Sequence, residues 1–326
     1  MTSSLLPDRT NTTICFAHAA YRLGERFALR RSGIDFFEVR TADELWVRID
    51  GADVLVVSGL WRNELIGRAT RLRFVQSISA GIDQYSVSAF GASGIRLASA
   101  QGANERAVAE HAVALILALS RKLHTARDHQ LRHYWRPMIS DPALREDELG
   151  GKTLLVVGLG RIGSRLATLG RAFGMRIIGI KRNPAAAGEL ADAVVGQDGL
   201  IGLLPQADVV ALTCPLTPQT ERLINAEALA AMKPSALLVN VARGRVVDES
   251  ALIAALASGR LAGAGLDCSW EEPLPPSSPL WALENVLITP HSAGETRRYE
   301  DNVIDLLLAN LERLWAGETR LVNQVL

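Results

Sequence analysis

Short apolar runs alternate with amphipathic, helix-like stretches along most of the chain. This alternation is typical of parallel α/β proteins, in which each buried strand is followed by a helix that covers the sheet. A first series of strands is predicted at residues 13–17, 35–39, 54–58, 74–78 and 95–98. A second series is predicted at residues 153–157, 176–180, 208–212, 236–241, 264–266 and 286–289. The pattern therefore predicts an α/β fold with two doubly wound parallel sheets.

The segments between and after the two series predict how the domains are divided. Residues 104–123 form a long helical pattern, and the polar stretch from about 124 to 151 is expected to be irregular. A last helical pattern, residues 296–315, follows the second series and is expected to pack back on the first domain. We therefore expect one domain from residues 1–103 plus 295–326 and another from residues 104–294.

Composition and charge exclude several classes of protein. The chain has 326 residues, of which 48% are hydrophobic and 21% charged, as in folded globular proteins. Lys plus Arg equals Asp plus Glu at 35 each, so no overall field gathers nucleic acid or anionic lipid. The longest apolar run, residues 112–119, is too short to span a membrane. Three scattered cysteines and no signal-peptide pattern predict a reduced, cytoplasmic protein without a metal site.

The strongest local motif is the glycine-rich turn at residues 156–163, Val-Val-Gly-Leu-Gly-Arg-Ile-Gly. It follows a predicted strand and opens a predicted helix, as a dinucleotide-binding fingerprint must. Gly158 permits the tight turn, Gly160 lets the backbone approach a pyrophosphate, and Gly163 allows close packing of helix and strand. The N–H groups of Arg161 and Ile162 would face the phosphates at the start of the helix. The turn predicts a bound dinucleotide.

The end of the next strand indicates which dinucleotide is bound. NAD-binding proteins usually carry Asp or Glu there, which accepts hydrogen bonds from the ribose hydroxyls. This chain has Lys181, Arg182 and Asn183 instead. Two cations and an amide suit a 2′-phosphate, although they could also be ordinary solvated loop residues. We expect NADP(H), with NAD(H) possible.

Three further segments at predicted strand ends contain charged or titratable residues that could take part in catalysis. Arg243 follows one strand, Asp267 follows the next and leads to Glu271-Glu272, and His291 follows the last. A single Arg or His is more often structural, but all three segments lie at the sheet edge that bears the glycine turn. Reduction of a carbonyl needs a cation that holds the substrate and an acid that donates a proton. Arg243 and His291 can supply them.

The ordered motifs resemble those of the D-isomer-specific 2-hydroxyacid dehydrogenases. The similarity covers residues 50 to 300 and includes the segments 79–83, 107–111, 158–163, 215–220 and 240–249 and the pair Pro290-His291. The resemblance implies a flavodoxin-like substrate domain and a Rossmann dinucleotide domain, with the active site in the cleft between them. It also implies hydride transfer between a nicotinamide cofactor and C2 of a small 2-oxo or 2-hydroxy acid, and a homodimer formed through the helix of residues 104–123.

The resemblance implies roles for individual residues. Arg243 would bind the substrate carboxylate and carbonyl oxygen, and His291 would be the acid and base. Glu272, rather than Glu271, would orient His291 because it directly precedes Pro273. Further contacts with the cofactor would come from Cys214, Pro215, Thr220, Val241, Ala242, Asp267 (to the nicotinamide carboxamide) and Gly294. Substrate contacts from the first domain would come from Ala80, Gly81 and Ile82, so catalysis would need closure of the cleft.

The chain departs from the family pattern in two places. Residues 267–270 read Asp-Cys-Ser-Trp where Asp-Val-Phe-Glu is common, and the acidic residue that selects NAD is missing. Basic residues at that position resemble those of NADPH-dependent glyoxylate and hydroxypyruvate reductases. Two alternatives stay open. An enzyme similar to formate dehydrogenase would be expected to have Gln in place of Glu272, and a catalytically silent NAD(P)H-sensing protein would keep only the fold.

Overall fold

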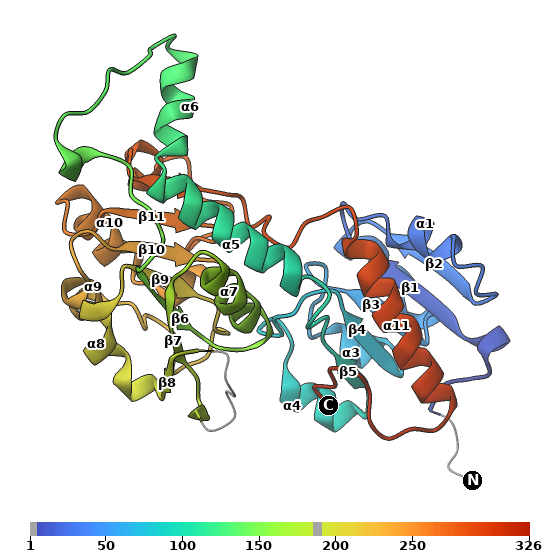
Figure 1. Cartoon of the computed structure of the whole chain (residues 1–326). Helices are drawn as coiled ribbons and strands as arrows, with labels where there is room; N and C mark the ends of the chain where they lie inside the picture. The colour runs from blue at the N-terminus through green and yellow to red at the C-terminus, as the bar shows by residue number, and fades with distance from the viewer. Residues whose placement is uncertain (1–4, 185–190) are drawn as a thin grey trace. The chain divides into compact units, whose positions relative to one another are not determined.

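The computed structural model describes residues 5–184 and 191–326, and the chain divides into two compact units (Figure 1). The first unit comprises Met1–Asn104 and Glu295–Leu326, and the second comprises Glu105–Gly294. The junctions lie at or within one residue of those expected from the sequence. Each unit contains one sheet whose neighbouring strands are all parallel.

The sheet of the first unit has the strand order β2-β1-β3-β4-β5. Its strands are β1 (Thr13–Ala17), β2 (Asp35–Val39), β3 (Val54–Val57), β4 (Phe74–Ser77) and β5 (Arg96–Ala98). One face is covered by α1 (Leu23–Ala28) and α11 (Tyr299–Trp315). The other face is covered by α2 (Ala42–Arg48), α3 (Leu65–Arg68) and α4 (Val87–Ser93).

The terminal helix α11 packs on the first unit, as its apolar pattern requires. Val303, Leu307 and Leu311 are fully buried against this sheet. Asn310 is also fully buried, but its amide donates to Gln76 Oε1 at 2.9 Å and its oxygen accepts from the Val322 N–H at 2.7 Å. The polar group is thereby satisfied, and it joins helix, sheet and C-terminal segment.

The sheet of the second unit has the order β12-β11-β10-β9-β6-β7-β8. Its strands are β6 (Thr153–Val157), β7 (Arg176–Ile180), β8 (Ala193–Val195), β9 (Val209–Leu212), β10 (Leu237–Asn240), β11 (Gly263–Leu266) and β12 (Val286–Ile288). Helices α5 (Glu105–Ser120) and α7 (Arg161–Ala172) cover one face, and α8 (Leu200–Leu203), α9 (Ala226–Ala231) and α10 (Glu249–Ala257) cover the other. The chain order reverses at β6, and ligands bind at the carboxyl ends of strands beside such a switch point.

Two elements differ from the sequence prediction. The stretch expected to be irregular after residue 123 begins with the helix α6 (Leu123–Leu131), and β8 was not predicted. Helix α6 buries none of its residues, and β8 is a half-buried edge strand of three residues. Neither element therefore has the apolar periodicity that identifies buried helices and strands. Single 3-10 turns occur at Arg9–Asn11, Ile49–Gly51, Pro142–Leu144, Gln197–Gly199, Leu204–Gln206, Gly244–Val246 and Pro279–Ala282.

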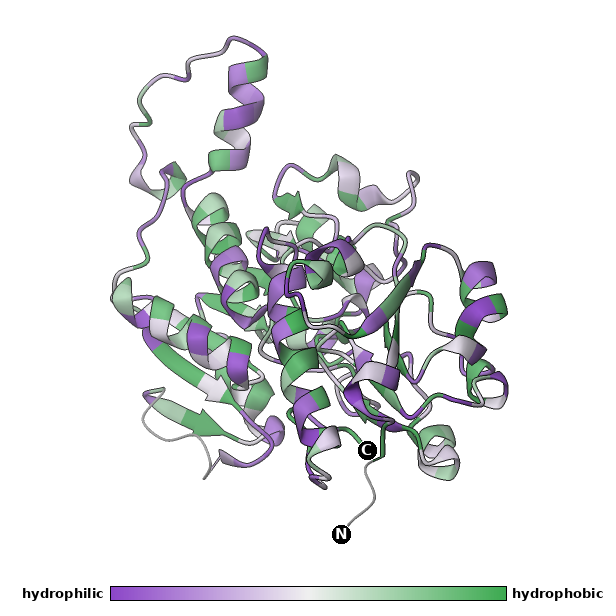
Figure 2. Cartoon of the chain, turned by 90° about the vertical axis from the view of Figure 1, so that its right-hand side faces the viewer, coloured by the Kyte–Doolittle hydropathy of each residue, from purple (hydrophilic) through white to green (hydrophobic). Residues whose placement is uncertain are grey.

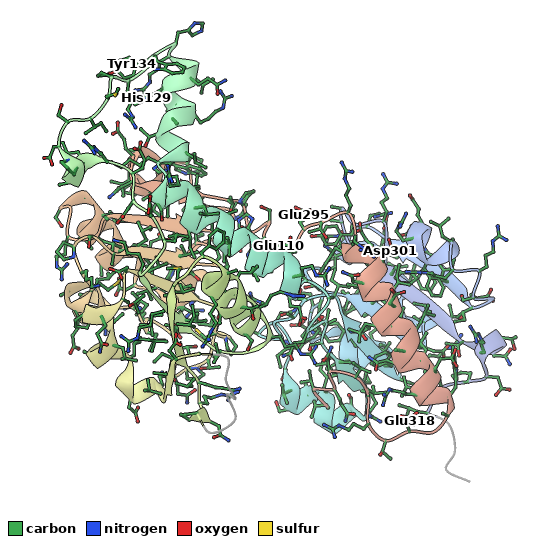
Figure 3. The ribbon with its side chains drawn as sticks, viewed as in Figure 1. Glu110, His129, Tyr134, Glu295, Asp301 and Glu318 are labelled. Carbon is green, nitrogen blue, oxygen red and sulfur yellow. The ribbon has the colours of Figure 1, made fainter. Side chains whose placement is uncertain are left out.

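Helix α6 and the loop to residue 139, here called the arm, project from the second unit (Figures 1 and 2). Figure 3 shows His129 and Tyr134 together near its end, where their rings meet edge to face at 4.9 Å. Trp135 and Met138 are 96% and 92% exposed. The arm thus displays apolar side chains that its own unit leaves uncovered. Within the described residues, no helix is long and apolar enough to cross a membrane.

Candidate active site

The glycine-rich turn lies directly after β6, where the strand order reverses. Gly158 has φ +103°, and a Cβ there would lie 2.6 Å from the backbone of Cys214. A Cβ on Gly163 would lie 2.3 Å from the Gly158 oxygen, so both positions need glycine because the backbones approach so closely. A Cβ on Gly160 would meet nothing within 4 Å, which leaves open space before the first turn of α7.

This open space fits a pyrophosphate. Gly160 is the N-cap of α7 and offers no side chain to its first N–H groups, which belong to Arg161, Ile162 and Gly163. The N–H groups of the first turn of a helix attract anions. The residues present therefore fit the dinucleotide that the sequence predicts. Lys181 is half-buried directly after β7, and Arg182 and Asn183 are exposed beside it.

The remaining predicted cofactor residues border the same edge of the sheet. Cys214 is buried beneath Gly158, and Val241 and Ala242 are buried at the end of β10. The Thr220 hydroxyl is buried and donates to the Pro215 carbonyl at 2.7 Å, so this side chain closes the turn at residues 215–220. Gly294 is half-buried and ends the second unit.

Glu272 and His291 form a hydrogen-bonded pair, with 2.8 Å between His291 Nδ1 and Glu272 Oε2. The other oxygen of Glu272 accepts the Ser269 N–H at 3.1 Å. The structure thus brings Glu272 to His291, as the sequence predicts. The side chains are 40% and 45% exposed, so a substrate can reach the ring.

The pair shifts the pKa of both members. The hydrogen bond with Glu272 and its negative charge raise the pKa of His291 above its ordinary value, although burial and Arg243 act against them. Burial alone would raise the pKa of Glu272, but His291, the Ser269 N–H and Arg243 outweigh it and lower that pKa. Both shifts favour an imidazolium beside a carboxylate, which is the state that can donate a proton.

Arg243 leaves β10 on a turn shaped by its neighbours. The amide of the buried Asn240 donates to the Arg243 carbonyl at 3.0 Å and accepts the Ala242 N–H at 3.0 Å. A Cβ on Gly244 would lie 1.8 Å from the Ser269 carbonyl oxygen, so glycine lets the loop after β11 lie against this turn. Arg243 is close enough to influence the pKa of both Glu272 and His291.

The carboxylate of Asp267, which the sequence predicts to contact the nicotinamide carboxamide, accepts hydrogen bonds from the loop after β12. It is 2% exposed and accepts the Thr289 hydroxyl at 2.6 Å and the Ser292 N–H at 2.9 Å. His111 Nε2 lies 2.9 Å from the same hydroxyl. Sequence reasoning missed Thr289 and His111 as site residues. The available signals were that Thr289 directly precedes Pro290-His291 and that His111 ends a segment already noted as similar to the family.

A cavity of about 610 Å³ adjoins the pair within the second unit. Glu272 and His291 are among the residues that line it, and Leu274, Leu280 and Trp281 contribute apolar surface. Ala80, Gly81 and Ile82 lie in the first unit, half-buried after β4, where Ser58 and Ser79 hydroxyls hydrogen-bond at 2.5 Å. Fold and site together define a nicotinamide-dependent oxidoreductase.

Comparison with known proteins identifies the family. Residues 113–293 match the family model described as D-isomer specific 2-hydroxyacid dehydrogenase, NAD binding domain. The chain is 38% identical to a glyoxylate reductase of Aeropyrum pernix over 271 residues, which are 80% of this chain and 79% of that protein. It is 36% identical to a D-3-phosphoglycerate dehydrogenase of Methanocaldococcus jannaschii over 85% of this chain, but spans only 52% of that protein.

A solved relative extends the similarity over both units. It is a D-isomer specific 2-hydroxyacid dehydrogenase from Xanthobacter autotrophicus Py2 in complex with NADPH and MES, 29% identical, with a TM-score of 0.83. The alignment covers 97% of this chain and 98% of that one. The chain belongs to the D-isomer specific 2-hydroxyacid dehydrogenase family. It is a dehydrogenase that uses a nicotinamide cofactor.

Proposed function

We propose that the protein is an NADPH-dependent reductase of small, polar 2-oxo acids of the glyoxylate and hydroxypyruvate type. The observation that carries the proposal is the hydrogen-bonded pair of His291 and Glu272 on the same sheet edge as Arg243 and the glycine-rich turn. This edge combines a proton donor, a cation for a carboxylate and a place for a pyrophosphate. The names of the Aeropyrum and Korarchaeum relatives, both glyoxylate reductases, support the substrate class.

In the reductive direction, the side chains orient and protonate the substrate. Arg243 binds the substrate carboxylate through its planar fork and polarises the carbonyl oxygen. His291, held as imidazolium by Glu272, donates a proton to that oxygen from Nε2 because Nδ1 is engaged with the carboxylate. Reduced nicotinamide supplies hydride when bound. In oxidation, neutral His291 takes the proton back.

The cofactor preference rests on the residues after β7. Lys181 and Arg182 bring two positive charges to the position where NAD-binding proteins carry a carboxylate. A 2′-phosphate adds up to two negative charges, and guanidinium binds phosphate with paired hydrogen bonds. The Xanthobacter relative was solved with NADPH, which fits the preference. NAD(H) remains the second cofactor of the proposal.

The K181A/R182A double variant tests this preference. We expect the KM for NADPH to rise about tenfold or more, with little change for NADH, because a phosphate contact through a charged hydrogen bond is lost. Arg176→Ala is the matched control, since Arg176 is exposed at the opposite end of the same strand. Equal losses for both cofactors would contradict a 2′-phosphate site.

Two alternative functions are less well supported. Oxidation of formate needs no proton donor, whereas here the Glu272 carboxylate raises the pKa of His291 and so favours its protonated form. A silent NAD(P)H sensor would not need Arg243, Glu272 and His291 to be assembled within one unit. We retain neither as the main function.

The proposal extends to assembly and compartment. A second copy of the chain would cover the exposed Trp135 and Met138 of the arm, which supports a homodimer. The sequence predicts that residues 104–123 form the dimer contact, and the exposed apolar side chains of the arm that follows this helix would extend such a contact. Cys15, Cys214 and Cys268 are buried free thiols, as fits a cytoplasmic protein.

A substrate panel tests the central proposal. Purified protein is expected to oxidise NADPH when it is given glyoxylate or hydroxypyruvate, and the loss of nicotinamide absorbance measures the rate. His291→Ala is expected to lower kcat by at least two orders of magnitude while the Kd for NADPH stays unchanged. If no 2-oxo acid in a broad panel consumes either cofactor, the reductase proposal fails. Unchanged turnover of the variant would remove His291 from the chemistry.

A further inference from the structure

A buried polar network connects α5 with the loop that carries His291. Asp267, at its centre, receives the Thr289 hydroxyl and the N–H groups of Ser292 and Ala293. The Ala293 N–H lies 3.2 and 3.1 Å from the two carboxylate oxygens. These donors stand on both sides of His291 along the chain. One carboxylate therefore holds the two ends of the loop whose middle residue is the proposed acid and base.

The third member of the network comes from a different element. His111, on α5, places Nε2 2.9 Å from Thr289 Oγ1 and 3.5 Å from Asp267 Oδ1. A threonine hydroxyl has one proton, and at 2.6 Å the charged carboxylate is the stronger acceptor for it. The hydroxyl must then accept the Nε2–H of His111. In this chain of hydrogen bonds, His111 therefore donates to Thr289, and Thr289 donates to Asp267.

The loop needs such external support. His291 has φ +53°, a left-handed conformation that is uncommon for residues other than glycine. Conformations of this kind persist where the surroundings hold them in place. Within the loop itself, the His291 N–H donates to the Thr289 carbonyl at 2.9 Å, which is a short-range contact two residues back along the chain. Contacts with Asp267 fix the residues on either side.

We propose that His111 is a positioning residue for His291 and acts through the Thr289 hydroxyl and the Asp267 carboxylate. Helix α5 then helps to set the orientation of the imidazole. This inference rests on the proposed function, in which His291 is the acid and base. Misplacement of a catalytic group by about 1 Å can cost on the order of a hundredfold in rate, so a loosened support is measurable.

Two matched pairs of variants test the network. His111→Phe keeps a ring but removes the donor, whereas His111→Gln keeps an amide N–H that can reach Thr289. Thr289→Val removes the hydroxyl, whereas Thr289→Ser keeps it. We expect kcat for glyoxylate reduction to fall about tenfold in His111→Phe and Thr289→Val, roughly the equivalent of one hydrogen bond. The KM for NADPH should stay unchanged, and His111→Gln and Thr289→Ser should restore most of kcat.

The double variant His111→Phe/Thr289→Val gives the sharpest readout. Both changes break the same chain of bonds, so the double variant is expected to be no slower than the slower single variant. Multiplied losses would overturn the proposal, as would wild-type kcat in His111→Phe or an effect on KM alone. If Thr289→Val does not fold, the His111 pair still decides, because the His111 side chain is partly exposed, at 23%.

Measurement of His291→Ala in the same series separates this inference from the proposed function. An active His291→Ala variant would refute the role of His291 itself. An inactive His291→Ala variant beside a fully active His111→Phe would refute the network alone. Unfolding temperatures of all variants, measured with NADPH bound, ensure that the rates compare folded proteins.

Discussion

The charge of Glu272 should set the pH at which the enzyme stops reducing its substrate. Glu272→Gln keeps the shape of the side chain and an oxygen that can accept from His291 Nδ1, but removes the negative charge. Two unit charges about 4 Å apart attract by about 1 kcal/mol in water and by about 4 kcal/mol near a protein surface. The side chains are 40% and 45% exposed, so solvent screening favours the lower end of this range. Since about 1.4 kcal/mol corresponds to one pKa unit, the pKa of His291 should fall by about one unit.

The direction of the effect follows from the chemistry. Glu272 raises the pKa of His291, and reduction needs the protonated ring, so wild-type reduction persists below that raised pKa and is lost as pH rises through it. In Glu272→Gln this loss should occur about one pH unit lower. Oxidation needs the neutral ring and rises with pH through the same pKa, so its rising limb should move to lower pH as well.

The assay is kcat for glyoxylate reduction with saturating NADPH, measured across the pH range from the nicotinamide absorbance. Glu271→Gln is the matched control, because this adjacent carboxylate is exposed and the structure brings Glu272, not Glu271, to His291. The control should keep the wild-type midpoint. The reasoning is refuted if the midpoint of Glu272→Gln equals that of the wild type, or if Glu271→Gln moves it equally.

Three further changes have expected outcomes. Arg243→Lys keeps the charge but loses the planar fork of the guanidinium, so the KM for glyoxylate should rise about tenfold. Arg245 forms a surface ion pair with Glu221, and Arg245→Lys should leave this KM unchanged. Equal effects of the two variants would contradict the proposed role of Arg243 in binding the substrate carboxylate. Gly158→Ala should lower the unfolding temperature and weaken NADPH binding because the new Cβ meets Cys214. Gly67→Ala should do neither, because a Cβ at this position of α3 meets open space. A Gly158→Ala variant with wild-type unfolding temperature and NADPH affinity would contradict the close packing at this turn. Trp135→Glu should shift the protein from dimer to monomer in sedimentation, whereas Trp46→Glu, on the first unit, should leave the dimer intact. A wild-type monomer would exclude the dimer outright.

The strands were predictable because strands of parallel sheets are buried on both faces and read as continuous apolar runs. The runs at β1, β3 and β6, for example, are almost wholly buried. Helix α6 and strand β8 escaped because they bury little, so no periodicity marks them. The return of α11 to the first unit was expected because this helix has an apolar face to bury. It follows the last strand of the second series, so packing on the first domain was the economical choice.

Where a candidate residue directly follows a strand, its place at the sheet edge could be predicted from the sequence. Arg243 and His291 were chosen from such positions, and the pairing of Glu272 with His291 was expected from the family pattern. The hydrogen bond between His111 and Thr289 joins residues 178 positions apart, and no spacing in the sequence indicates it. Likewise, Asp267 holds its loop through backbone N–H groups. Nearly every residue has such a group, so the residue types in the sequence do not indicate which ones bind Asp267.

Three loops lie at the carboxyl edge of the second sheet, after β10, β11 and β12, and each contacts the next one along the chain. The loop after β11 lies against the turn after β10 only because residue 244 is glycine, and Asp267 on that loop then holds the loop after β12. A change in any one loop therefore moves the others, and substitutions within this set should combine non-additively. Residues in these loops can therefore hardly be replaced to suit a different substrate. We therefore propose that variation in the R group of a 2-oxo acid is accommodated by residues outside these loops, and Ala80, Gly81 and Ile82, which the family resemblance implies as substrate contacts, are the first positions at which to test it.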